Sequence, residues 1–331
     1  MDATRNPTLA DLKARLDANG KPARIIEILM REDGILEDMP MIECNQKTKH
    51  VTTLRTKLPT PVARLFNRGT PATKSDVGTI EEAPIMLEDW AEADADMVDK
   101  NGEGYRMGEH TAHIQGFNQE VGRMAFYGNS NLNPFDEFMG LAPRYNSLTD
   151  AELKDYTITG GATSGSNNTS IWMINWGEET THAIYPAGSP AGLSHKDLGK
   201  RVKTYVDGSS VERNIEVYDD KYAWDIGFVV RDYRSIVRIP NIDVTALKAD
   251  PTTGGADIYE LISRAQERIQ GNGRTVIYGN RKVREFARLQ AQNKKNVRIT
   301  PNEVTGKRVM DVDGIPFRLA DALVNNEATV S

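Results

Sequence analysis

The residues best placed to do chemistry are two histidines and a glutamate within one helical turn. Glu109, His110 and His113 lie in the stretch EHTAH, and histidines so spaced share one face of a helix, where they could bind a metal ion. The zinc-protease motif needs histidines four residues apart with a glutamate after the first, and this stretch has neither feature. The spacing therefore favours a structural role, with the histidines as hydrogen-bonding groups between a helix and a sheet.

Two glycine-rich stretches imitate phosphate-binding loops. Residues 160–167, GGATSGSN, have the Gly-x4-Gly spacing, but Ser166 stands where a lysine would reach the phosphates. Residues 102–108, GEGYRMG, miss the dinucleotide-binding spacing by one residue, and no apolar strand precedes them. The chain has no Gly-x-Ser-x-Gly motif, and its carboxylates come in runs typical of a surface. We therefore expect no enzymatic activity, no cofactor and no metal.

The composition excludes several other classes of protein. The 331 residues suffice for about two domains, and a net charge of −6 argues against a protein that coats DNA. The single cysteine, Cys44, excludes an intrachain disulfide, suits a reducing cytoplasm and is expected to be buried. No apolar run approaches the roughly 20 residues that span a bilayer, and the charged N-terminus does not resemble a signal peptide.

The elements that would position these residues alternate between helices and strands. An apolar stripe of Ile114, Phe117, Val121 and Met124 predicts a long helix over 105–127. Further helices are predicted at 8–19, 22–34, 257–270 and 281–293. Strands are predicted at 169–177, 224–232, 235–242 and 274–280, and a strand pair around the turn Asp313–Gly314. The first of these is apolar on both faces, as a central strand would be. The pattern indicates a mixed α/β or α+β body.

Residues 46–58, QKTKHVTTLRTKL, have the threonine-rich composition of a strand but no apolar face. One set of alternate positions reads Lys-Lys-Val-Thr-Arg-Lys, and the other reads Thr-His-Thr-Leu-Thr-Leu. A strand that is wet on both faces cannot lie within a compact domain. We therefore expect it to project as an arm or ribbon.

Charge divides this region into two blocks. From Cys44 to Ser75 there are seven bases and no acid, whereas from Asp76 to Glu103 there are ten acids and one base. Either both blocks are solvated faces, as charge runs usually are, or they meet each other or a neighbouring subunit. The candidate basic contacts are Lys47, Lys49, Arg55, Lys57, Arg64 and Arg68. The candidate acidic contacts are Glu81, Glu82, Glu88, Asp89, Glu92, Asp94 and Asp96.

Five stretches in order along the chain carry a family resemblance. They are KLPTPVARLFNRGTPATKS, GYRMGEHTAHIQGFNQEVGRMAFYGN, NPFDEFMGLAPRY, the strand segments TSIWMINWG and AWDIGFVVRDYRSIVRIPNID, and DGIPFRLADAL. In this order they resemble the tip of the extended loop, the spine helix, the corner after it, the axial strands and the terminal strand of the major capsid proteins of tailed double-stranded DNA phages. The fold is the Hong Kong 97-type, and the likeness is greatest to the short-tailed phage branch.

The resemblance implies an α+β fold with an N-terminal arm, an extended loop, a peripheral domain with a long spine helix, and an axial domain. Its implied boundaries are 1–43 for the arm and short helices, 44–100 for the extended loop, 101–135 for the spine helix, 136–300 for the axial domain and connections, and 301–331 for terminal strands returning to the peripheral domain. At the corner, asparagines tolerate left-handed conformations and Pro134 prevents the helix from continuing. An apolar patch would then fill the joint between the domains or contact the next subunit: Phe135, Phe138, Met139, Leu141 and Tyr145.

The implied function is that of a major capsid protein, which forms hexamers and pentamers of an icosahedral shell around DNA that it does not bind sequence-specifically. A separate scaffolding protein, no N-terminal cleavage, a portal protein and a cement or decoration protein are further expectations. The chain would reside in the virion after assembly in the host cytoplasm, without contacting a membrane. The alternatives are an α/β enzyme with a protruding oligomerisation hairpin, a nucleic-acid binder using the ribbon 47–74, and a bacterial nanocompartment shell protein.

Overall fold

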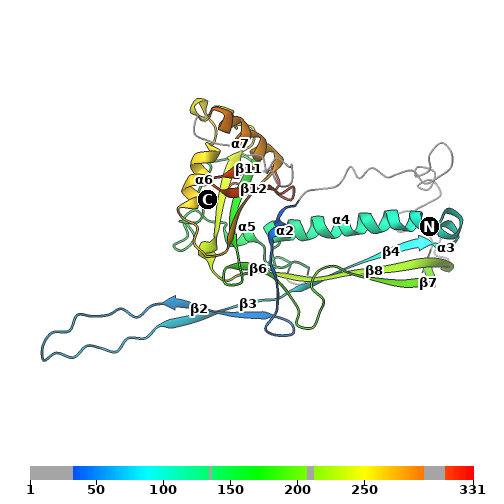
Figure 1. Ribbon diagram of the computed structural model, residues 1–331, viewed down its shortest axis with the longest axis horizontal. Helices are drawn as coiled ribbons and strands as arrows, with labels where there is room; N and C mark the ends of the chain where they lie inside the picture. Colours follow the sequence, from blue (N-terminus) through cyan, green and yellow to red (C-terminus); the bar gives the residue numbers. More distant parts are fainter. Residues whose placement is uncertain (1–32, 134–135, 207–211, 294–309) are drawn as a thin grey trace.

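The computed structural model describes residues 33–133, 136–206, 212–293 and 310–331. Three parts are visible in Figure 1: a long helix on a narrow sheet, a thicker body of sheet and helices, and a thin hairpin that projects away from both. The helix predicted at 8–19 and nearly all of that at 22–34 lie outside the described residues.

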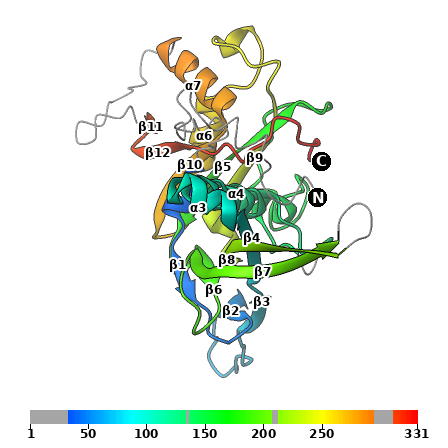
Figure 2. The same ribbon diagram turned by 90° about the vertical axis from the view of Figure 1, so that its right-hand side faces the viewer.

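The long helix is α4, Glu103–Tyr127, which confirms the predicted helix. It lies along a sheet of β4 (Ile85–Asp94), β8 (Glu212–Val230) and β7 (Ser194–Val206), in which β8 is central and antiparallel to both neighbours. The short helix α3, Ala95–Asn101, follows β4 at the outer end. Figure 2 shows α3 and α4 on one side of this sheet.

The apolar stripe of α4 packs largely as predicted. Phe117, Val121 and Met124 are buried in the core that the helix shares with the sheet. Ile114, expected on the same stripe, is instead 41% exposed. At that turn the position facing the sheet belongs to His113, whose ring stacks on Tyr222 of β8. A polar contact thus replaces the apolar one at this level.

The body is built on the continuation of the same sheet, in the order β11-β12-β10-β5-β6-β8-β4 with β1, β7 and β9 attached. Its other strands are β1 (Met41–Glu43), β5 (Asn168–Trp176), β6 (Thr181–Tyr185), β9 (Ile236–Asp243), β10 (Arg274–Gly279), β11 (Met310–Val312) and β12 (Ile315–Leu319). The remaining elements are α2 (Ile35–Asp38), α5 (Leu141–Arg144), η1 (Tyr233–Ser235), η2 (Pro251–Thr253), α6 (Ile258–Gln266) and α7 (Arg281–Asn293).

Strand β5 organises the body because both of its faces are buried. Trp172 and Ile174 belong to the core shared with α4, whereas Ile171 and Met173 belong to the core shared with α6 and α7. Such a strand reads as a continuous apolar run, as the sequence predicted. The predicted strand pair around Asp313–Gly314 is also confirmed, with both turn residues at positive φ.

The domain boundaries implied by the resemblance stay a prediction, and the structure shows where the segments within them lie. Only part of 44–100 projects, because β4 and α3 lie alongside α4. Within 136–300, β7 and the first part of β8 also lie with α4 and not in the body. Strand β12 pairs with β10 in the body, and only the tail after it returns to the end of α4. Strand β8, 19 residues long, runs through both parts.

The corner after α4 is formed by two glycines. The expectation that asparagines adopt left-handed conformations there is wrong. Among the described residues, the non-glycine positions with positive φ are Asn67, Asn241 and Asp313, none of which is in this corner. Instead the Gly140 N–H donates to the Gly128 carbonyl at 2.9 Å. A Cβ on Gly140 would lie 2.4 Å from the carbonyl oxygen of Met124, so only glycine allows this approach.

Replacing Gly140 by alanine should therefore destabilise the subunit by about 1–3 kcal/mol, the usual cost of forcing an extra carbon into a packed site. Thermal or denaturant unfolding of the purified chain measures this. Gly116→Ala in α4 is the matched control, since a Cβ there meets nothing within 4 Å and alanine should stabilise the helix by about 1 kcal/mol. Equal stability of the two variants would contradict the packing role of the corner.

Candidate functional site

The projecting hairpin is the most distinctive surface of the molecule. Its strands, β2 (His50–Lys57) and β3 (Asp76–Glu82), form a separate two-stranded antiparallel sheet with the register Val51 to Glu81 and Thr53 to Thr79. His50 and Thr52, at the root, are buried, and the chain beyond them is mostly exposed. The predicted projection of this ribbon is confirmed. Its root is more buried than the sequence suggested.

The predicted basic residues of the hairpin are mostly without partners. Within the described residues, the side chains of Lys47, Arg55, Lys57, Arg64 and Arg68 make no hydrogen bond or ion pair. A surface with several unpaired cations can bind an acidic or polar surface of another molecule.

One predicted basic residue does have a partner. Lys49 donates to Glu81 on the opposite strand at 2.7 Å. Because both side chains are exposed, this cross-strand pair adds little to stability, about 0–1 kcal/mol.

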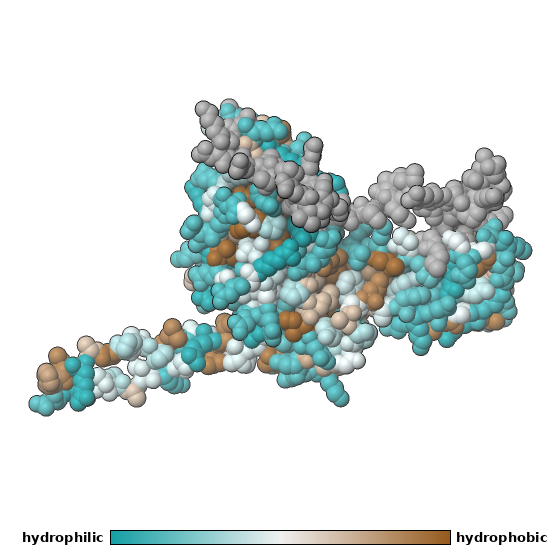
Figure 3. Space-filling model, in the orientation of Figure 1, coloured by the Kyte–Doolittle hydropathy of each residue, from teal (hydrophilic) through white to brown (hydrophobic). Residues whose placement is uncertain are grey.

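The end of the hairpin is also apolar. Leu58, Val62, Leu65 and Phe66 are all exposed, and the Phe66 side chain is fully so. Figure 3 shows hydrophobic surface at the tip of the hairpin and at separate places along it. Several exposed large apolar side chains on one thin arm favour a contact surface.

Most of the predicted acidic residues already have partners within the chain. Glu82 pairs with Arg144, Glu88 with Lys221, Asp89 with His113 and Glu92 with Lys203, while the Asp94 carboxylate accepts from the backbone N–H of Asp96. The side chains of Glu82 and Glu92 are mostly covered, whereas those of Glu81, Glu88 and Asp89 are about half exposed. The latter can still accept a second partner.

Of the predicted joint residues, the structure buries Phe138, Leu141 and Tyr145, leaves Met139 half-buried, and does not describe Phe135. Phe138 stacks on Phe228 of β8. Tyr145 packs edge-on against Trp172 and donates to the Tyr233 carbonyl at 2.7 Å. These three side chains therefore lie in the core between α4 and the sheet.

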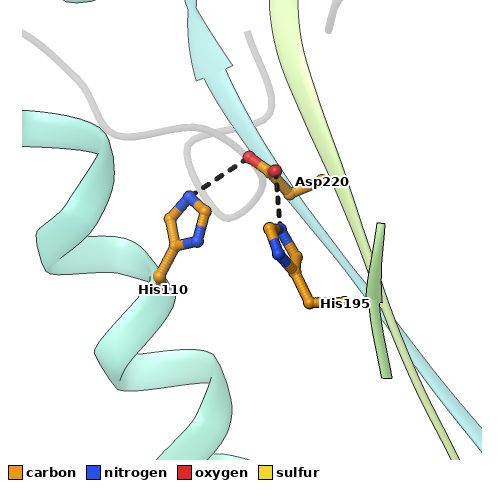
Figure 4. Close-up of side chains that lie close together, drawn as sticks. All are labelled: His110, His195 and Asp220. Carbon is orange, nitrogen blue, oxygen red and sulfur yellow. Dashed lines mark hydrogen bonds and ion pairs between the residues drawn. The ribbon is translucent and has the colours of Figure 1, made fainter. Parts of the chain in front are cut away.

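The histidines of EHTAH do not act together. His113 pairs with Asp89 of β4, whereas His110 faces His195 of β7 and Asp220 of β8 (Figure 4). Burial lowers the pKa of His110, Asp220 opposes this shift, and nearby positive groups add to it. His113 thus makes the predicted helix–sheet contact, whereas Nε2 of His110 has no hydrogen-bond partner among the described residues, and the side chain of Glu109 is not described. His195 and Asp220 belong to no recognisable sequence motif with His110. Only the fold places them beside it.

The root of the hairpin contains a second pair of histidines. His50 of β2 lies edge-on to His182 of β6, with ring centroids 5.7 Å apart. The pKa of His182 is lowered to about 4, mainly by burial and also by repulsion from His50 and Arg231, while a hydrogen bond with the Gly177 carbonyl acts in the opposite direction. Burial and Arg231 lower the pKa of His50 as well. Protonation of either ring is therefore disfavoured where the hairpin joins the body.

The other features singled out in the sequence are structural. Cys44 is buried beside Ile184 and Val229, and burial raises the pKa of its thiol. The stretch 160–167 is a loop before β5. No helix among the described residues has the length and hydrophobicity to cross a membrane.

An arm of helix and sheet, a mixed body and a projecting hairpin together define a subunit of a viral capsid shell. The chain superposes on one from the structure of bacteriophage Epsilon15 with a TM-score of 0.78 and 33% identity, covering 98% of this chain and 97% of that one. The bacteriophage JBD30 capsid matches with a TM-score of 0.51 and 11% identity, over 97% and 98% of the two chains, which bears on the fold alone. No curated protein sequence matches the chain significantly.

The family model of the major capsid protein GP7 matches residues 17–331, so the chain belongs to that family. It is a structural protein of the phage virion and not an enzyme. The predicted Hong Kong 97-like α+β fold is confirmed. Neither an enzyme nor a nanocompartment shell is favoured by these matches.

The lowered pKa of His182 predicts a pH-dependent stability. The ordinary pKa of this side chain is 6.5 and its pKa in the folded chain is about 4. Between pH 6.5 and pH 4, His182 is therefore protonated in the unfolded chain and neutral in the folded chain. The free energy of unfolding should be unaffected by His182 above pH 6.5. It should decrease toward pH 4, and His182 should account for up to about 3 kcal/mol of that decrease. His182→Gln should flatten that decrease in denaturant titrations at pH 7.5 and 4.5. An unchanged pH dependence in the variant would assign the effect to other groups.

Proposed function

We propose that this major capsid protein assembles as hexamers and pentamers into an icosahedral head shell around double-stranded DNA. The observation that carries the proposal is the family match over residues 17–331, together with the full-length likeness to a 33%-identical phage chain. Head-to-tail contacts between subunits would allow it, because one pair of complementary surfaces can close rings of either order. The net charge of −6 fits a shell that encloses DNA without binding it sequence-specifically.

Other virion components complete the proposal. A separate scaffolding protein would guide assembly in the host cytoplasm, a portal protein would occupy one vertex, and a cement or decoration protein would bind the outside. The resemblance noted in the sequence supports each of these partners, and none of them has a site that the contacts within this chain identify.

The hairpin is proposed to lie across an adjacent subunit. Three properties support this: it projects beyond the body, most of its basic side chains lack partners among the described residues, and apolar side chains near its end are exposed. A thin two-stranded ribbon is marginal alone in water, so contact with a neighbour would also stabilise it. Of the predicted acidic contacts, the exposed Glu81, Glu88, Asp89 and Asp96 are the accessible candidates.

Particle size tests the assembly proposal. Co-expressed with its neighbouring genes, the purified chain should sediment as rings or megadalton particles, and electron microscopy should show five- and six-fold capsomers. Light scattering that reports only monomers or dimers at every concentration, with scaffold supplied, would be incompatible with a shell subunit.

The double variant Arg55→Glu with Lys57→Glu tests the hairpin charges. Both side chains are exposed, so the subunit should fold normally, with a stability change within about 0.5 kcal/mol. Assembly should be blocked or misdirected, because each shell repeats the reversed contact in every subunit. Wild-type assembly should also weaken as salt rises.

The matched control is Arg55→Lys with Lys57→Arg, which keeps both charges and should assemble like the wild type. Turbidity and negative-stain imaging compare the three proteins at several salt concentrations. Normal shells of normal salt tolerance from the charge-reversed variant would mean that the hairpin charges are only a solvated face.

A further inference from the structure

A buried polar cluster lies between the first half of α4 and the strands beneath it. At its centre is Asp220 of β8, whose side chain is 2% exposed. Arg106 of α4 donates to it through a two-pronged contact, with Nε 2.7 Å from Oδ2 and Nη2 2.7 Å from Oδ1. The same guanidinium also reaches Asp197 of β7 at 2.7 Å. Two carboxylates thus face one guanidinium, which leaves one net negative charge when the nearby imidazoles are neutral.

Two imidazoles complete the cluster. The Nε2 atom of His195 lies 2.9 Å from Asp220 Oδ1, and the Nε2 atom of His110 lies 3.3 Å from Oδ2 (Figure 4). The ligand atoms of these three residues all lie within 4.8 Å of one another. Tyr222 stacks on the His195 ring and meets the His110 ring edge-on, which restrains the orientation of both.

Among the described residues, two polar atoms here lack a hydrogen-bond partner, the hydroxyl of Tyr222 and Nε2 of His110. His110 Nε2 is buried and makes no hydrogen bond, although Asp220 is close to it. A buried nitrogen without a partner is costly, and native structures satisfy such atoms with protein, water or an ion. Because this nitrogen faces the Asp220 carboxylate, a cation between the two groups would satisfy both.

We propose that His110, His195 and Asp220 bind a divalent transition-metal ion of the Zn²⁺ class. Two imidazole nitrogens and one carboxylate oxygen form a ligand set that zinc prefers, whereas calcium and magnesium prefer oxygen ligands alone. Both Nε2 atoms already face the carboxylate, that of His195 at 2.9 Å from Oδ1 and that of His110 at 3.3 Å from Oδ2, so an ion bound between the two rings could take either oxygen as its ligand. His195 is 40% exposed, which provides a route from solvent.

Arg106 does not exclude this ion. A carboxylate offers about four lone-pair positions, and the guanidinium uses one on each oxygen of Asp220. One lone pair per oxygen remains for the metal. Carboxylate ligands are commonly hydrogen-bonded on their other side, which holds them in place, and the second acceptor, Asp197, keeps the guanidinium's charge compensated.

The bound ion would fasten the long helix to the sheet. Its ligands come from α4, β7 and β8, which are far apart in sequence. A cross-link there would oppose sliding or bending of α4 against the strands. The site lies within one subunit and depends only on the fold of that subunit. The zinc proposal can therefore be tested separately from the proposal on shell assembly.

Zinc titration of the full-length chain tests the site. Protein stripped with a chelator and dialysed at pH 7.5 is titrated with ZnCl₂ by calorimetry, and bound metal is counted by mass spectrometry. We expect one zinc per subunit and a rise in melting temperature, because ligand binding to the folded state stabilises it. Replacing zinc by Co²⁺ should give the intense visible absorption of a tetrahedral site.

Variants locate the ion. His195→Gln, at a partly exposed position, should fold and should weaken zinc binding at least about tenfold, and His110→Gln should do the same. His113→Gln is the matched control, since it lies one turn along α4 and pairs with Asp89 outside the cluster. Wild-type protein that binds no zinc, or zinc binding that survives both His195→Gln and His110→Gln, would overturn the proposal.

Discussion

The buried ion pair between Arg238 and Glu327 joins the parts of the chain that meet at the inner end of the long helix. Both side chains are almost fully buried, and the Arg238 guanidinium donates to Glu327 at 2.9 Å. Arg238 also donates to the carbonyls of Ala142 and Tyr145 in the corner, while Tyr127 at the end of α4 donates to Glu327. Removing one partner of such a pair typically costs 3–5 kcal/mol, because the other charge is left buried and unpaired. Helix, corner, sheet and C-terminal tail therefore depend on one another at this point.

The continuity of the sheet has a similar effect on a larger scale. Strand β8 pairs with β4 and β7 under the helix and with β6 in the body, so the two parts share hydrogen bonds as well as a core. The hairpin is different. Its two strands pair only with each other, and beyond the root most of their side chains are exposed. A subunit with a rigid frame and one unsupported arm suits a shell protein, because the arm can adjust to its neighbour while the frame keeps its shape.

Charge serves two roles in this chain. Along β4 and β8, acids and bases are paired within the subunit, as in the contacts of Glu88 with Lys221 and of Glu92 with Lys203. These pairs account for much of the acidic block that stands out in the sequence. The basic block has few such partners among the described residues, so the unpaired charge lies on the hairpin and not on the acidic strand β4.

The sequence by itself determined the elements whose pattern is local. It predicted the long helix, the doubly buried strand β5, the turn at Asp313–Gly314 and the projecting ribbon, because periodicity, burial on both faces and the lack of an apolar face are all visible over a few residues. It also carried the family resemblance. It did not reveal that β4 leaves the ribbon to pair with β8, that Gly140 rather than an asparagine closes the corner, or that His110 meets His195 and Asp220. Those contacts join residues far apart along the chain, and only tertiary packing decides which distant strand, carbonyl or imidazole fills the space beside them.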